Sequence, residues 1–202
     1  MLILVRHGES AWNAGDRFAG WADVALTDTG REEARSAGLW LRGRGIVPSV
    51  VHTSLLSRAC TSAHLMLDAC GAPNVPVLST ARLNERHYGA LQGMPRTVAV
   101  ERYGADHVAR WRRGVSDRPP VDADGRAESL SDVRVRLRPY VDEDLIPALD
   151  AGHTVLVVSH GNTLRMLTQA LEGLSDDDAA ALEVPTGGSR IYETVSGLLH
   201  AR

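Results

Sequence analysis

Short runs of consecutive apolar residues recur along the chain and predict strands buried on both faces of a sheet. The first run covers residues 2–5 and stops at a charged and polar segment. Comparable runs follow at residues 49–53, 75–78 and 154–159. An alternating run at 189–195 predicts a late strand with one more polar face. Pro76 lies within the third run, so we place that strand nearer an edge, because proline cannot donate to a ladder.

Helical periodicity fills the gaps between these runs. After the first strand, Ala34, Ala37 and Leu41 recur at helical spacing, with acidic residues early and arginines late, as the helix dipole favours. The predicted helices span residues 29–44, 56–70, 129–149 and 163–171. Alternating strands and helices predict an α/β fold with a mostly parallel central sheet flanked by helices. We expect one domain over residues 1–202, with a surface loop at 115–127.

The composition excludes two kinds of catalytic or binding site, because the chain contains no lysine. The chain has 202 residues, 44% of them hydrophobic, which is enough for a core without disulfides. All 22 basic residues are arginines and no lysine occurs. Schiff-base catalysis and a P-loop both need a lysine, so both are excluded. Every fixed cation is therefore a guanidinium, which suits bidentate phosphate binding.

The net charge and the hydropathy of the chain also limit which partners we expect. The formal net charge is −3, so we expect no nucleic-acid partner. The apolar N-terminal run is too short for a signal peptide, and no run approaches a membrane span, so we expect a cytoplasmic protein without membrane contact. Cys60 and Cys70 lie ten positions apart in a predicted helix, a spacing that indicates buried residues and no metal site.

Two of the predicted strands end in the same way. His7-Gly8 follows the first strand, and His160-Gly161 follows the fourth. A single histidine at such a place is more often structural, but two lie together where parallel sheets bind ligands, at the C-terminal ends of strands. Arg6 precedes the first pair, and Arg58 begins the helix after the second strand. Two histidines with two arginines, without metal-ligand spacing, predict a phosphate site and no metal.

A neutral imidazole can attack phosphorus, provided that cations surround the nonbridging oxygens and an acid serves the leaving oxygen. Glu85 is the candidate acid, because it follows the third strand. A plainer interpretation remains open, in which Glu85 only pairs with an arginine on a surface loop.

These residues carry a resemblance to a known family. The segment from Leu4 to Asn13 (LVRHGESAWN) resembles the signature of the histidine phosphatase superfamily. The segments LNERHYGALQG, from Leu83, and Trp111-Arg112-Arg113 are similar to the cofactor-dependent phosphoglycerate mutases within it. Further segments of the resemblance are FAGW from Phe18, SLLSRA from Ser54, ESL from Glu128, HGNTLR from His160 and VPTG from Val184. The resemblance spans nearly the whole chain and implies the three-layer phosphoglycerate-mutase-like fold.

The resemblance also implies roles for individual residues. His7 would be the phosphorylated nucleophile, Glu85 the proton donor and acceptor, and His160 a stabiliser of the transferring group, with Arg6 and Arg58 on its oxygens. The remaining expected binding residues are Ser10, Asn13, Ala19, Gly20, Arg86, Tyr88, Arg96, Arg112, Arg113, Gly161 and Asn162. The implied reaction is the glycolytic and gluconeogenic interconversion of 2- and 3-phosphoglycerate, primed by 2,3-bisphosphoglycerate.

Three departures from the family pattern keep an alternative open. Arg96 stands where the family usually has lysine, and Ala19 stands where it usually has a hydroxyl. The stretch between Pro120 and Glu128 is short, and we expect neither the usual insertion nor a closing tail. A phosphatase that hydrolyses a small phosphorylated metabolite through the same phosphohistidine therefore remains the alternative, and a non-catalytic phospholigand-binding module is a third reading. The oligomeric state, a monomer or a small homo-oligomer, is not readable from the chain.

Overall fold

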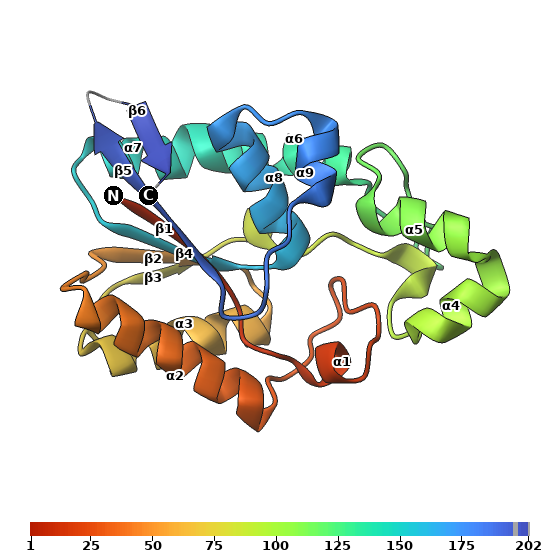
Figure 1. Ribbon diagram of the computed structural model, residues 1–202, viewed down its shortest axis with the longest axis horizontal. Helices are drawn as coiled ribbons and strands as arrows, with labels where there is room; N and C mark the ends of the chain where they lie inside the picture. The colour runs from red at the N-terminus through yellow and green to blue at the C-terminus, as the bar shows by residue number, and fades with distance from the viewer. Residues whose placement is uncertain (196–197, 202) are drawn as a thin grey trace.

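The computed structural model describes residues 1–195 and 198–201, and its centre is a mixed sheet of six strands (Figure 1). The strand order is β3-β2-β4-β1-β5-β6. The strands are β1 (Leu2–Arg6), β2 (Val50–Thr53), β3 (Val77–Ser79), β4 (Val155–Ser159), β5 (Ser189–Val195) and β6 (Leu198–Ala201). The first four are mutually parallel, whereas β5 pairs antiparallel with β1 and β6 antiparallel with β5. The predicted mostly parallel sheet is confirmed, and β3 lies at its edge as Pro76 indicated.

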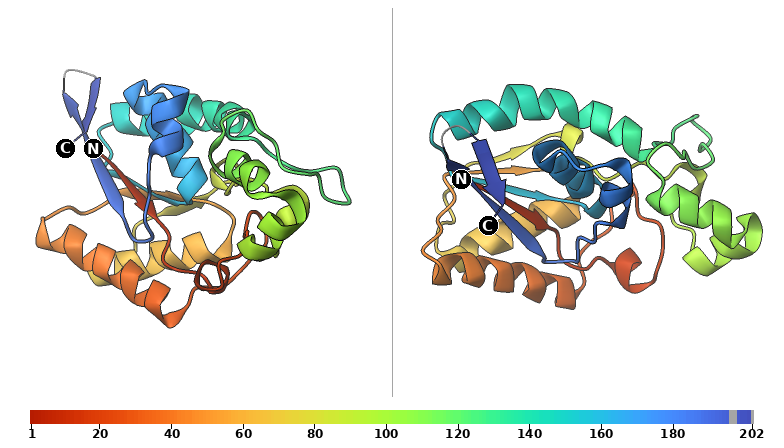
Figure 2. Two further views of the ribbon diagram at one scale, coloured as in Figure 1. Left: turned by 45° about the vertical axis from the view of Figure 1, so that its right-hand side comes forward. Right: turned by 45° about the horizontal axis from the view of Figure 1, so that its top comes forward.

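Helices cover both faces of the sheet and produce three layers (Figures 1 and 2). The two long helices α2 (Asp28–Gly43) and α3 (Ser57–Cys70) pack on one face, where they meet Ile3 and Val5 of β1. The helices α6 (Leu130–Tyr140) and α8 (Gly161–Glu172) pack on the other face, against Leu2 of the same strand and its neighbours. Burial on both sides explains why β1 is apolar without alternation.

The predicted helix over residues 129–149 is interrupted. It forms α6, a π-helical turn η3 (Val141–Leu145), and α7 (Ile146–Asp150). Pro139 and Pro147 lie on either side of the turn. Each proline lacks an amide proton and crowds the preceding turn, so the regular hydrogen-bond ladder cannot continue through this segment.

A separate group of short helices lies beside the carboxyl ends of the parallel strands (Figure 1). The helices α4 (Arg96–Tyr103) and α5 (Ala105–Arg113) pack around a small cluster that contains Phe18, Leu91, Ala99 and Val108. The remaining short elements are α1 (Ala11–Ala14), η1 (Ala81–Leu83), η2 (Gly89–Leu91) and α9 (Asp176–Ala181). Residues 114–129 form no helix or strand, as predicted for a surface loop. Within the described chain, no helix combines the length and apolarity that a membrane crossing requires.

Candidate active site

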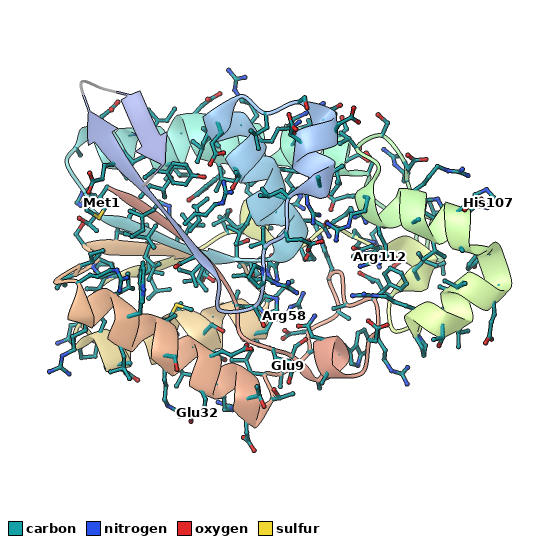
Figure 3. All side chains as sticks on the ribbon, viewed as in Figure 1. Met1, Glu9, Glu32, Arg58, His107 and Arg112 are labelled. Carbon is teal, nitrogen blue, oxygen red and sulfur yellow. The ribbon has the colours of Figure 1, made fainter. Side chains whose placement is uncertain are left out.

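The register of the sheet brings the two strand-end histidines together. Arg6 of β1 lies opposite Ser159 of β4, and the His7 backbone N–H donates to the Ser159 carbonyl at 2.9 Å. The chain leaves both strands at the same level, so the rings of His7 and His160 meet edge to face, with centroids 4.8 Å apart. Arg58 comes from the adjoining start of α3, and Arg112 approaches from α5 (Figure 3).

His7 is held as a neutral imidazole, and only one of its ring nitrogens has a hydrogen-bond partner among the described residues. Its Nδ1 lies 2.6 Å from the backbone carbonyl of Gly8, which can only accept, so Nδ1 carries the proton. Burial lowers the pKa of His7 well below its ordinary value, and the nearby charges of Arg58 and Arg6 lower it further. The lone pair therefore resides on Nε2, the arrangement that a nucleophile needs.

His160 is the complementary ring. Its Nε2 lies 2.8 Å from the hydroxyl of Ser54. That hydroxyl oxygen accepts from the Leu56 N–H at 3.2 Å and keeps its own proton to donate to the ring. Nδ1 then carries the ring proton, and within the described structure it is buried without a partner. Burial lowers the pKa of His160 well below its ordinary value, with Arg58 contributing next. The ring therefore presents a neutral N–H donor beside His7.

Two arginines flank the histidines and are themselves held by backbone carbonyls. Arg6 donates from Nη1 to the Val184 carbonyl at 2.7 Å, and its Nε is buried without a partner in the described chain. Arg58 donates to the carbonyls of Ala22 at 2.8 Å and Gly20 at 2.7 Å. Burial lowers the pKa of both arginines. Each guanidinium has five N–H groups, so both retain donors for an anion.

Glu85 lies in the loop between η1 and η2, lines the same cavity as His7, and acts electrostatically on Arg6 and Arg58. Its Oε1 accepts from the backbone N–H of Arg86 at 2.8 Å. Among the described residues it forms no ion pair with an arginine, so the plain surface-pairing interpretation is not what the structure shows. The carboxylate is free to exchange a proton with a bound molecule.

A cavity of about 130 Å³ unites these groups. Most of the sequence-predicted residues line it, namely Arg6, His7, Asn13, Ala19, Gly20, Arg58, Glu85, Tyr88, Arg96, Arg112, Arg113, Gly161 and Asn162. A cavity this small and this cationic favours a small polyanion. No group of three or more histidine, cysteine or acidic side chains within the described residues has the arrangement of a metal site.

Comparison with known proteins now decides the family. The family model described as histidine phosphatase superfamily (branch 1) matches residues 2–198. The chain belongs to the histidine phosphatase superfamily. The relationship predicted from the sequence motifs is thereby confirmed, and so is the fold class.

Several curated relatives carry one name. A "2,3-bisphosphoglycerate-dependent phosphoglycerate mutase" from Corynebacterium glutamicum is 44% identical over 95% of this chain and 85% of its own length. A protein of the same name from Mycobacterium leprae is 47% identical over 92% of this chain and 83% of its own. Similar solved structures include a mycobacterial glucosyl-3-phosphoglycerate phosphatase and Bacillus stearothermophilus YhfR. The first is 27% identical with a TM-score of 0.81, covering 100% of this chain and 96% of that one; the second is 28% identical with a TM-score of 0.81, covering 99% and 94%.

Three predicted residues of this histidine phosphatase do not line the cavity. His160 contacts the ring of His7, which does line it. Ser10 caps α1: its side chain accepts from the Asn13 backbone N–H and donates to the Asn13 side-chain oxygen at 2.8 Å. Arg86 is fully buried, with its guanidinium over the ring of Tyr88 and one N–H donated to the Trp111 carbonyl. Ser10 and Arg86 therefore position residues that do reach the cavity.

Two of the predicted cations are already paired. Arg96 lies 3.0 Å from Asp16, and Arg113 forms an ion pair with Glu183. Arg112 has no such partner in the described structure; burial lowers its pKa, and the charge of Arg96 lowers it further. Arg112 is thus a cation of the cavity lining without an ion-pair partner among the described residues, as is Arg17.

Five residues that line the cavity were not predicted from the sequence. They are Arg17, Phe18, Arg165, Glu183 and Val184. Phe18, Arg165 and Val184 stand inside motifs of the resemblance, so their motif membership was the available signal. Arg17 directly precedes such a motif, and Glu183 lies in a loop without a local pattern. Only the folded chain brings these two to the site.

Proposed function

We propose that this histidine phosphatase is a 2,3-bisphosphoglycerate-dependent phosphoglycerate mutase, as the sequence resemblance predicted. The observation that carries the proposal is a second group of cations in the cavity lining, Arg112 with Arg96 and Arg113, beside the Arg6 and Arg58 charges that act on His7. Within the described residues Arg112 forms no ion pair. A phosphatase that acts on a simple phosphate monoester needs cations only around the phosphoryl group that it removes. A mutase must hold an anionic group at each end of its substrate. The names and identities of the curated relatives support the same conclusion.

The residues fit a bisphosphorylated priming donor. At the histidine end, the buried Nε of Arg6 and Nδ1 of His160 lack partners in the described chain and can donate to phosphoryl oxygens. Elsewhere in the lining, Arg112 offers a fixed cation, with the charge of Arg96 close to it. When bound, 2,3-bisphosphoglycerate supplies the phosphoryl group that primes His7. We propose that no metal takes part, because guanidinium groups supply the positive charge.

The chain's own groups divide the work of the reaction. The Nε2 lone pair of His7 accepts the phosphoryl group, while Nδ1–H stays bonded to Gly8 and holds the ring in line. Arg6, Arg58 and the Nδ1–H of His160 stabilise the charge that builds on the nonbridging oxygens. Glu85 takes a proton from the attacking hydroxyl and returns it to the leaving oxygen.

Hydrolysis is the second candidate. Similar structures include a mycobacterial glucosyl-3-phosphoglycerate phosphatase, and residues 114–129 form a loop without helix or strand. Water that reaches phosphorylated His7 would end the cycle as hydrolysis. Under either activity we expect the cytoplasm as the location, a small phosphorylated molecule as the partner, and a monomer or small homo-oligomer.

A direct assay separates the two activities. Conversion of 3-phosphoglycerate to 2-phosphoglycerate is measured with and without 2,3-bisphosphoglycerate, beside phosphate release from a panel of phosphorylated metabolites. We expect isomerisation that depends on the bisphosphate and exceeds hydrolysis. Phosphate release that exceeds isomerisation for any panel member would replace the mutase assignment with the phosphatase.

A variant tests the role of the second group of cations. Arg112→Met should lower mutase kcat/KM on the order of a hundredfold, since a charged hydrogen bond contributes about 1.5–3 kcal/mol. Hydrolysis of an aryl phosphate, which has no second anion, should change little. Arg110→Met is the matched control on the same helix, because Arg110 faces Asp117 and does not line the cavity. Equal losses in both reactions for Arg112→Met would contradict the proposed two-ended site.

A further inference from the structure

A continuous hydrogen-bonded chain runs along one wall of the cavity and ends at Tyr88. Arg165, on the first turns of α8, donates from Nη1 to the Asn162 Oδ1 at 2.6 Å. The amide nitrogen of Asn162 then donates to the Tyr88 hydroxyl oxygen at 3.0 Å. All three residues line the cavity, and Arg165 and Asn162 are each 6% exposed.

The position of Arg165 leaves the Asn162 amide one orientation. Residues three apart on a helix lie on the same face, and a helical side chain leans towards the N-terminus, so Arg165 reaches back to Asn162. A guanidinium can only donate, so the amide must turn its oxygen towards it. The opposite orientation would place two donors face to face in a buried site. The amide NH₂ therefore points to Tyr88.

This orientation also assigns the proton of Tyr88. The hydroxyl oxygen accepts from Asn162, which leaves the hydroxyl proton free to donate elsewhere. Tyr88 borders the cavity, so a bound molecule is the acceptor within reach. We infer that Arg165 is a positioning residue that fixes the Asn162 amide and thereby makes Tyr88 a hydrogen-bond donor to an oxygen of the bound phosphorylated acid.

Two features of the surroundings support this assignment. The guanidinium carbon of Arg86 lies 4.4 Å from the centre of the Tyr88 ring. Burial and the Glu85 charge raise the pKa of Tyr88, but the Arg86 charge, with hydrogen bonds from Arg86 and Asn162, outweighs them and lowers it, which makes the hydroxyl a stronger donor. Arg165 is also anchored on its other side, by an Nε donation to the Leu182 carbonyl at 3.0 Å, so its position is fixed from two directions.

Titration of Tyr88 tests the inference without substrate. The absorbance rise of tyrosinate is followed against pH for the whole protein, and subtraction of the Tyr88→Phe curve isolates Tyr88 from the other three tyrosines. The charged groups around the Tyr88 hydroxyl are Arg6, Glu85, Arg86, Arg112 and Arg165. In Arg165→Met we expect Tyr88 to titrate higher by on the order of one pH unit, because the amide no longer has a fixed orientation.

Removing the Arg165 charge could raise this titration by itself, so the measurement is repeated in Asn162→Leu. If Arg165 acts through the amide, Arg165→Met should add little to the shift that Asn162→Leu already causes. An undiminished shift in the Asn162→Leu background would mean a purely electrostatic effect and would overturn the inference. Arg165→Lys keeps the charge and a donor and should preserve most of the parent titration. If Arg165→Met does not fold, Arg165→Gln replaces it.

Kinetics supply an independent readout that rests on the proposed function. Arg165→Met and Tyr88→Phe should each lower mutase kcat/KM about tenfold, and the double variant should fall little further, because both remove the same hydrogen bond. Arg138→Met, which breaks an exposed pair with Asp142, is the control and should match the parent. Additive losses would show a direct or unrelated role for Arg165 and overturn the inference. Absence of mutase activity in the parent would refute the proposed function, whereas the Tyr88 titration would still decide the inference.

Discussion

Two buried neutral histidines make the stability of this protein depend on pH in a predictable direction. The pKa values of His7 and His160 both lie well below the ordinary value of 6.5, chiefly because the rings are buried. In the unfolded chain they take up protons as pH falls through 6.5, whereas the folded protein resists protonation. The unfolded state therefore binds more protons below this pH. The stabilisation is complete above 6.5 and is lost as pH falls towards the folded pKa values.

The magnitude follows from linkage. A group that stays neutral in the folded state loses about 1.4 kcal/mol of stability for each pH unit below its unfolded pKa. Between pH 7.5 and 5.5, each of the two histidines should lower the free energy of unfolding by about 1.4 kcal/mol, so together they account for about 2.7 kcal/mol. The pKa values of His52 and His87 are also lowered by burial and add to the total slope.

Urea unfolding at several pH values measures this effect. The free energy of unfolding is followed from pH 7.5 to 5.5 for the parent, His7→Gln and His160→Gln. Each substitution should reduce the pH-dependent loss by about 1.4 kcal/mol, whatever it does to stability at pH 7.5. His64 is exposed in α3, so His64→Gln is the control, and its free energy of unfolding should depend on pH as steeply as that of the parent. An unchanged slope in His7→Gln would show that His7 is not held neutral, and the argument for its Nε2 lone pair would fail with it.

Three further substitutions test the surroundings of the site. Ser54→Ala should lower the free energy of unfolding by about 1–3 kcal/mol, because it leaves the buried His160 Nε2 unpaired; turnover should fall about tenfold with any substrate, and unchanged kcat would contradict the tautomer assigned here. Gly8→Ala should destabilise the protein by about 1–3 kcal/mol or more in urea unfolding, since its Cβ would lie 1.9 Å from the Gly30 carbonyl oxygen; a urea midpoint equal to the parent's would contradict that close approach. Arg96→Met should raise the KM for phosphoglycerate with little change in kcat, while Arg96→Lys should retain most of the affinity; a loss confined to kcat would remove Arg96 from substrate binding.

The sheet could be predicted from the sequence because its strands are buried on both faces. An uninterrupted apolar run such as residues 2–5 must be buried on both faces, and in a protein without membrane contact the centre of a sheet provides that burial. Its register is then set by the parallel strands on either side. The helices α4 and α5 were not predicted, because each is short and buries a single apolar residue, Ala99 in α4 and Val108 in α5. The π-helical turn was missed for another reason: the apolar positions on both sides of it keep helical spacing, and only Pro139 and Pro147 interrupt the ladder.

The residues of the candidate site also fall into two groups, those that could be predicted from the sequence and those that could not. Residues at strand ends, such as His7 and His160, could be found because the fold class itself places them together. The HGNTLR motif gave a signal for Arg165 but not for its role, and Glu183 had no signal at all, because both roles depend on residues from distant segments of the chain. In the sequence, Arg165 is one more polar residue of α8. Its role becomes visible only in the fold, where Tyr88, more than seventy residues earlier in the chain, accepts from the Asn162 amide that Arg165 orients. Glu183 reads as a loop acid until α5 brings Arg113 against it. Chemistry carried by strand ends is thus readable along the chain, whereas the proton assignments that tune it arise only where separate segments meet.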